Sequence, residues 1–297
     1  MRSLNRIMRS TGIAGIIGVV VVTAGCGGGG GGSAPSTSGF AIPNDLTKLK
    51  PGVVSTISPT LAAWTPGDEW YYAISGAVRQ NTSVVKSIHS SYLGLTIGTP
   101  TGGDPGTTAL TDQRYLVFDD NSVESSVLKT FLTGGGGASY FEVGDTAETD
   151  GNVEEAGNGL CDRQPFEVFP ATFGLSTGFT GSAAMFVPTG AADKSVTACA
   201  AGGATITNQE QVSFTVLDQE NVTVGAGTFE TWKVRSTRVY VNQGIQSVDT
   251  AWWAPQIGGF VRMDSERQIG QEHESFSYKL VGFKNQATAT QLPLVKM

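Results

Sequence analysis

Three stretches of the chain alternate regularly between apolar and polar side chains. Their apolar positions are Trp70, Tyr72, Ile74 and Val78; Val212, Phe214 and Val216; and Phe276, Tyr278 and Leu280. Successive side chains of a β-strand point to opposite faces, so a period of two places these residues on one buried face of a sheet. The pattern predicts strands over residues 70–79, 211–216 and 275–280.

Two short loops separate further strand-like runs. The sequence GAG at 225–227 precedes a long run over residues 228–241, and PQIGG at 255–259 separates Trp252 and Trp253 from the run FVR at 260–262. Short loops that contain glycine or proline connect antiparallel neighbours. No stretch after the first 25 residues has helical periodicity with caps. The expected fold class is therefore all-β, mainly antiparallel, in a curled sheet that is half-barrel or barrel-like.

The first 25 residues have the order of a secretory signal peptide. Arg2, Arg6 and Arg9 form a basic start, an apolar run follows over residues 13–22, and three small residues precede Cys26. A membrane-spanning helix needs about 20 apolar residues. Because this run is much shorter, a cleaved signal over residues 1–25 is favoured over an anchor helix.

The position of Cys26 resembles the bacterial lipoprotein signal, in which small residues precede a cysteine that is lipidated after cleavage. Thr23 stands where that signal usually has leucine. The resemblance implies several acyl chains on Cys26, which are enough for stable membrane anchoring. Residues 27–39 then form a Gly/Ser-rich tether of roughly 20 Å root-mean-square length. Gly27 stands where aspartate would signal inner-membrane retention, so the outer membrane is the expected location.

The acidic composition narrows the classes of partner. The first 25 residues hold three of the 19 basic side chains and none of the 26 acidic ones, so the mature chain has a formal charge of −10. Nucleic acids and anionic lipids are bound by Lys- and Arg-rich surfaces, so we expect no nucleic-acid partner and membrane contact through the lipid anchor alone. Forty glycines and 15% charged residues indicate a turn-rich β domain over residues 40–297.

One of the three cysteines is the expected lipidation site, and the other two are candidates for a disulfide. If Cys26 carries lipid, Cys161 and Cys199 remain as an even pair in an oxidising compartment, where disulfides persist. Their bridge would close an insertion over about residues 150–205, which has weak strand patterning, and would stabilise it by roughly 4 kcal/mol. Two independent buried thiols are the alternative.

Three motifs resemble a widespread bacterial envelope family that is described only as a domain of unknown function. They are VGAGTFETWKVR at 224–235, WWAPQIGGFVR at 252–262 and YKLVGF at 278–283. GDEWYY at 67–72 is similar to the strand that opens such domains. The resemblance is sharpest after Val212 and fails across about residues 80–205. It implies an antiparallel β fold and contributes no catalytic residue.

One serine lies in a motif of serine hydrolases. Residues 174–178 read GLSTG, which matches the G-x-S-x-G nucleophile elbow at Ser176, and Asp249 and His273 follow in the order of a triad. An elbow needs a helix after the serine, and the sequence FTGS at 179–182 is a poor first helical turn. An envelope hydrolase that uses Ser176 is therefore the alternative to a non-enzymatic function.

Metal binding has little support in the sequence. The chain has two histidines, His89 and His273, and no HExxH motif, so histidine-rich zinc sites are excluded. An acidic loop is expected over residues 145–155, but its spacing does not fit an EF-hand, and a solvated loop is favoured over a calcium site. We expect no metal and no cofactor.

Trp232, Trp252 and Trp253 are the candidate ligand contacts. Aromatic side chains of a curled sheet can line a site for an apolar ligand, although they more often form the core. Only one of the neighbours Trp252 and Trp253 can face such a site. The leading hypothesis is a non-enzymatic, lipid-anchored envelope protein that binds an apolar ligand or a partner protein. A surface structural or adhesive module is a further alternative.

Overall fold

The computed structural model describes residues 52–55, 58–99, 108–117, 123–134, 139–149, 160–188, 204–241 and 244–284. Within these residues a single sheet contains 13 strands. The strands are β1 (Gly52–Ser55), β2 (Glu69–Gln80), β3 (Ser83–Gly98), β4 (Thr108–Val117), β5 (Val123–Gly134), β6 (Tyr140–Thr149), β7 (Leu160–Phe169), β8 (Gly178–Pro188), β9 (Ala204–Val224), β10 (Gly227–Tyr240), β11 (Ile245–Ala254), β12 (Gly259–Ile269) and β13 (Glu272–Lys284). The described part of the chain includes one short 3₁₀ turn, η4 (Pro255–Ile257), and no helix long and apolar enough to cross a membrane.

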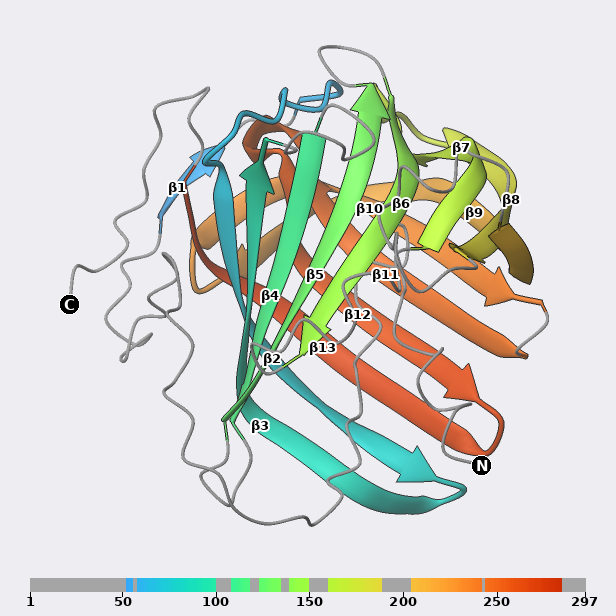
Figure 1. Ribbon diagram of the computed structural model, residues 1–297. Helices are drawn as coiled ribbons and strands as arrows, with labels where there is room; N and C mark the ends of the chain where they lie inside the picture. The colour runs from blue at the N-terminus through green and yellow to red at the C-terminus, as the bar shows by residue number, and fades with distance from the viewer. Residues whose placement is uncertain are drawn as a thin grey trace.

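The strands form an antiparallel ladder that curls round on itself (Figure 1). Strands β10 to β13 follow one another, β13 pairs with β2, and β2 to β9 continue in chain order. β9 also pairs with β10, so the ladder returns to the strand where it began. The described pairings are antiparallel except that of β1 with β10. The predicted fold class, a mainly antiparallel curled sheet, is confirmed.

Most of the core lies on one face of the sheet, which we call the inner face. It holds alternate residues of each strand, for example Trp232, Val234, Ser236, Arg238 and Tyr240 of β10, all of them buried. The apolar positions of the three alternating stretches are buried as predicted. Both predicted hairpin loops are also confirmed, because β9 turns into β10 at 225–226 and β11 turns into β12 through η4.

Strands β3 to β8 were not indicated by the sequence pattern. The prediction of an acidic loop at 145–155 is wrong for residues 145–149, which belong to strand β6. Within the stretch 150–205, which has weak strand patterning, β7 and β8 are strands of the same sheet. Strand formation depends strongly on packing and pairing with neighbours, which a single stretch of sequence does not contain.

The signal segment, Cys26, the tether and Cys199 lie outside the described residues, and nothing is described of the Cys161 side chain. The lipid attachment and the disulfide therefore stay predictions.

Candidate functional site: an aromatic pocket

An aromatic pocket lies at one end of the inner face. It is lined by Trp64, Trp70, Tyr72, Leu95, Phe169, Trp253, Gly258, Gly259 and Phe260. Its present free volume is about 10 Å³, which is room for about one water molecule. Most of these residues come from the motifs GDEWYY and WWAPQIGGFVR, so two segments far apart in the sequence meet here.

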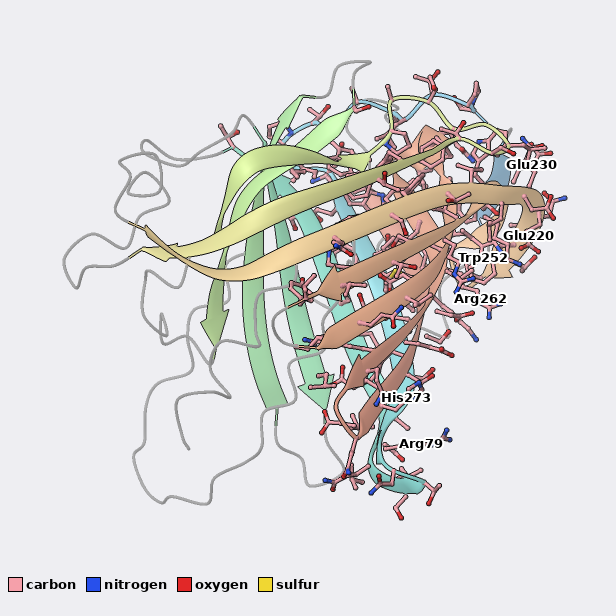
Figure 2. All side chains as sticks on the ribbon, turned by 90° about the vertical axis from the view of Figure 1, so that its right-hand side faces the viewer. Arg79, Glu220, Glu230, Trp252, Arg262 and His273 are labelled. Carbon is pink, nitrogen blue, oxygen red and sulfur yellow. The ribbon has the colours of Figure 1, made fainter. Side chains whose placement is uncertain are left out.

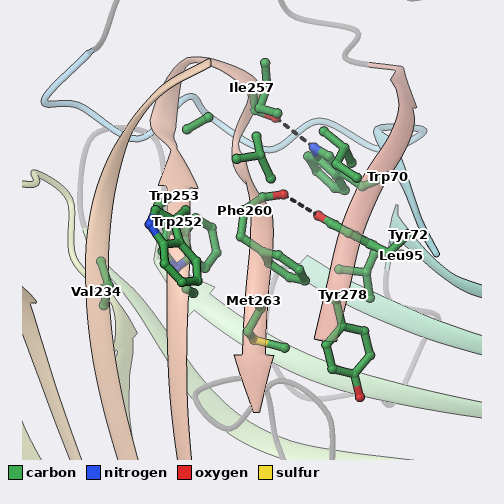
Figure 3. Close-up of a cluster of buried hydrophobic side chains, with 14 of the residues drawn as sticks. Trp70, Tyr72, Leu95, Val234, Trp252, Trp253, Ile257, Phe260, Met263 and Tyr278 are labelled. Atoms are coloured by element: carbon green, nitrogen blue, oxygen red, sulfur yellow. Dashed lines mark hydrogen bonds between the residues drawn. The ribbon is translucent and has the colours of Figure 1, made fainter. Parts of the chain in front are cut away.

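The two glycines after η4 form the platform on which two indole rings lie. The Trp64 Nε1–H donates a hydrogen bond to the Gly258 carbonyl (2.7 Å), and the Trp70 Nε1–H donates to that of Ile257 (2.9 Å; Figure 3). A Cβ atom at position 259 would lie 2.7 Å from Trp70 Nε1. Gly258 has φ +68°, in the left-handed region that glycine adopts readily. Glycine at both positions therefore permits the close approach of the rings.

Buried aromatic contacts build the walls of the pocket. The rings of Tyr72 and Phe260 stack with centroids 4.2 Å apart, and the Tyr72 hydroxyl donates to the Phe260 carbonyl at 3.0 Å (Figure 3). Burial raises the pKa of the Tyr72 hydroxyl well above its ordinary value, so the phenol stays neutral. Trp253 makes edge contacts with Phe169 at 5.1 Å and Phe260 at 6.0 Å. The lining is mostly apolar, and the polar side-chain atoms of Trp64, Trp70 and Tyr72 are bonded to backbone carbonyls.

An irregular segment, residues 58–65, crosses the end of the sheet over this pocket; we call it the strap. It is held by backbone hydrogen bonds from Leu61 N to Ala171 O (3.2 Å), Ala62 N to Pro255 O (2.8 Å) and Phe173 N to Pro59 O (2.5 Å). An isolated antiparallel bridge joins Thr60 and Thr172. The strap places the half-buried Trp64 against Phe169, with ring centroids 5.0 Å apart.

The three predicted tryptophans have different surroundings. Trp232 and Trp253 are register partners on the inner face, and Trp253 lines the pocket. The Trp232 indole donates to the carbonyl of Ser58 at 3.0 Å and so holds the start of the strap. Trp252 lies on the outer face, as the alternation predicts. The pattern missed Trp64 and Phe169, since Trp64 lies in a segment without strand periodicity.

On the outer face, the Trp252 ring contacts two cations, and Figure 2 shows it near Glu220 and Arg262. Lys233 Nζ is 5.2 Å and Arg262 Cζ 4.4 Å from the ring centroid, and the indole N–H donates to Glu220 at 2.5 Å. The Trp252 hydrogen bond, followed by the interactions with Lys233 and Arg262, lowers the pKa of Glu220. These charged side chains are a third to two-fifths exposed, and such pairs contribute little to stability.

Four charged residues are buried farther along the inner face: Arg238, Asp249, Arg267 and Glu274. Arg267 Nη1 lies 3.9 Å from Glu274 Oε2, and Arg238 Nη1 donates to the Tyr240 hydroxyl at 3.3 Å. Burial raises the pKa of Asp249 to about 6, although a hydrogen bond with Ser265 and the charges of Arg238 and Arg267 oppose the rise. The sequence pattern indicated none of these burials.

The structure does not assemble Ser176, Asp249 and His273 into a triad. Ser176 lies in an exposed turn with φ +65°, and strand β8 follows it instead of a helix. Asp249 is on the inner face, whereas His273 precedes the inner-face Glu274 and so points to the outer face.

The strand register also separates Ser176 from His273. Ser176 N donates a hydrogen bond to Val216 O. Following the paired residues from strand to strand, Val216 on β9 lies in the same row across the sheet as Tyr278 on β13. His273 lies five positions farther along that strand, roughly 17 Å away. Figure 2 shows it with Arg79 at the other end of the strands from Trp252.

Among the described residues, no three His, Cys, Asp or Glu side chains are grouped so that they could hold a metal ion. Asp145 and Glu148 lie on β6, and the remaining acidic residues of the expected loop, 150–155, lie outside the described residues. His89 is on β3, and nothing is described of its side chain.

The fold and the pocket define an all-β protein with an aromatic-lined inner face. No family model matches the chain, and no curated protein matches it. Among solved structures, the chain is similar to a beta-barrel-like protein of the domain of unknown function DUF1849 from Brucella abortus. The identity is 9% over 75% of this chain and 99% of that chain, with a TM-score of 0.39. It is also similar to the hypothetical lipoprotein YmcC from Escherichia coli, with 9% identity over 71% of this chain and 87% of that chain and a TM-score of 0.30.

Proposed function

We propose that this chain is a non-enzymatic, lipid-anchored protein of the bacterial envelope that binds an apolar ligand in the aromatic pocket. The observation that carries the proposal is the pocket itself, where six aromatic side chains converge from the strap, β2, β7, β11 and β12. Ligand sites are concave and mostly apolar, with few polar groups. The separation of Ser176 from His273 removes the geometric support for hydrolysis, since a nucleophile needs a base within hydrogen-bond reach.

Anchoring to the membrane rests on the signal segment and Cys26. We expect Cys26→Ser to abolish lipidation and to leave unprocessed precursor, because the lipid is attached as a thioether to the cysteine sulfur. Fractionation of cells and mass measurement of the amino terminus test this. A Cys26→Ser protein that is still processed normally and retained in the membrane would refute the lipid anchor.

Ligand binding is tested with single tryptophan substitutions and an apolar probe. Titration with a fatty acid, a phospholipid and a sterol-like probe should perturb the tryptophan fluorescence of the mature chain. Trp253→Phe should reduce the response, because Trp253 is one of the three tryptophans that line the pocket, with Trp64 and Trp70. Trp252→Phe is the matched control, since its ring lies on the outer face and should leave the response intact.

A titration in which none of the three probes changes any tryptophan signal would exclude the apolar ligand. Binding to an envelope protein would then be the remaining role. Equal responses from the two substituted proteins would place the ligand outside the aromatic pocket.

A further inference from the structure

The aromatic pocket is too small for a ligand in its present state. A volume of about 10 Å³ admits one water molecule but no hydrocarbon chain. Ligand binding there therefore requires part of the lining to move. The pocket is bounded by strands of the sheet and, at the end of the sheet, by the strap.

The strap is held more weakly than the strands around it. β2 and β13 are joined over most of their length by a ladder with one irregularity, as are β11 and β12. The strap makes one isolated bridge at Thr60, a few backbone bonds to residues 171–173 and 255, and two indole hydrogen bonds, from Trp64 to Gly258 O and from Trp232 to Ser58 O. Segments with few backbone hydrogen bonds open locally at a smaller free-energy cost than core strands. The strap is accordingly the part of the lining that can move.

Movement of the strap would enlarge the pocket without disturbing the lining residues that belong to the sheet. The strap contributes Trp64 to the lining, and its Leu61 is buried in the hydrophobic core. Removal of Trp64 would uncover the rings of Trp70 and Phe169, which it contacts and which are held by strands β2 and β7. The hydrogen bonds of Trp70 and Tyr72 to backbone carbonyls would persist, since neither partner is in the strap.

The chemistry of the opened pocket selects the ligand. Its walls are aromatic rings and Leu95, and the indole N–H of Trp70 and the Tyr72 hydroxyl are already bonded to carbonyls. Displacement of Trp64 frees the Gly258 carbonyl of the lining, but aromatic walls offer a polar ligand few other partners, so the loss of its hydration is costly. An unbranched hydrocarbon chain has no such loss and gains about 0.8 kcal/mol for each CH₂ it buries.

We propose that residues 58–65 are a displaceable strap, and that its displacement opens the aromatic pocket to the acyl chain of a fatty acid or lipid. The inference rests on the proposed function and adds to it the ligand class and the element that controls access. It also gives Trp232 a role, because its bond to Ser58 O fixes the point from which the strap leaves the sheet.

A disulfide between strap and sheet tests the inference. Thr60 and Thr172 are partners in an antiparallel bridge, and both are exposed. Cα atoms of such partners lie about 4.5–5.5 Å apart, within the range that a disulfide spans. Thr60→Cys/Thr172→Cys, made in the mature chain with Cys26→Ser, would lock the strap closed when oxidised. Dansylated undecanoic acid serves as the fluorescent acyl probe.

The oxidised lock should weaken binding of the probe by about tenfold or more, because apparent affinity falls with the fraction of open protein. Reduction with dithiothreitol should restore it. The control is Thr223→Cys/Thr228→Cys, a register pair in the β9–β10 hairpin, whose oxidation should leave affinity unchanged. Mass spectrometry verifies each disulfide, and thermal unfolding verifies that both variants fold.

Two results would overturn the inference, and they are distinguishable. Equal affinity of the oxidised and reduced lock would show that the strap does not control access, while the proposed function would stand. Absence of binding by the reduced lock and by the protein without the added cysteines would remove the proposed function, and the strap inference with it.

Discussion

Replacing Arg267 by methionine is expected to lower the free energy of unfolding by about 3–5 kcal/mol, because it removes the ion-pair partner of the buried Glu274 carboxylate. The Arg267 and Glu274 side chains are 6% and 2% exposed, and their charged atoms lie 3.9 Å apart. Asp249, on the neighbouring strand, also loses a favourable charge. Urea unfolding of the mature chain measures the change.

The double substitution Arg267→Met/Glu274→Met should recover most of that loss. Replacing a whole buried ion pair by apolar side chains is often neutral or stabilising, since it removes both desolvation penalties. Arg262→Met is the matched control, because Arg262 is a 40% exposed arginine on the outer face of the same strand. Its loss should cost about 1 kcal/mol or less. A double variant as unstable as Arg267→Met would show that the pair contributes more than charge compensation.

The second large effect concerns pH and Asp249. An ordinary aspartate has a pKa of 3.8, and the pKa of Asp249 in the folded protein is about 6. The folded state therefore binds the carboxyl proton of Asp249 more tightly than the unfolded state does. Stability contributed by Asp249 is therefore fully present below about pH 4 and is lost as the pH rises through about 6. The loss amounts to about 3 kcal/mol.

Asp249→Asn isolates this contribution from the other titrating groups. Relative to the unsubstituted protein, the asparagine variant should gain about 3 kcal/mol in unfolding free energy between pH 4 and pH 7.5, because it never carries the buried charge. Asp264→Asn, at a partly exposed position on the outer face, controls for removal of a carboxylate. Unfolding curves of Asp249→Asn and the unsubstituted protein that run parallel across this pH range would contradict the raised pKa.

Both effects concern a polar part of the inner face that lies away from the aromatic pocket. The strand register places Arg238, Ser247, Arg267 and Glu274 in one row across β10 to β13. A separate row is apolar except for one tyrosine hydroxyl, and it consists of Val234, Ala251, Met263 and Tyr278. Substitutions in the charged row should therefore change stability and leave binding of an acyl probe largely intact.

The sequence by itself determined the features that depend on neighbouring residues in the chain. Alternation at 70–79, 211–216 and 275–280 gave strands with the correct buried face, because a period of two is a local property of extended backbone. The loops GAG and PQIGG predicted two hairpins, since proline fixes the φ angle and glycine permits positive φ angles at the positions that they occupy. The same alternation placed Trp252 and Trp253 on opposite faces.

Tertiary structure alone decided which of these residues form a site. Trp64 meets Gly258, 194 positions away, and Trp70 meets Ile257, 187 positions away. No local pattern records such a contact, because it arises only when β2 and β12 are both aligned on β13. The burial of Arg238 and Glu274 also depends on contacts between strands. A charged residue at an inward-facing position is buried only if neighbouring strands supply an opposite charge. Strands β3 to β8 likewise exist through pairing with one another, which their own sequence does not specify.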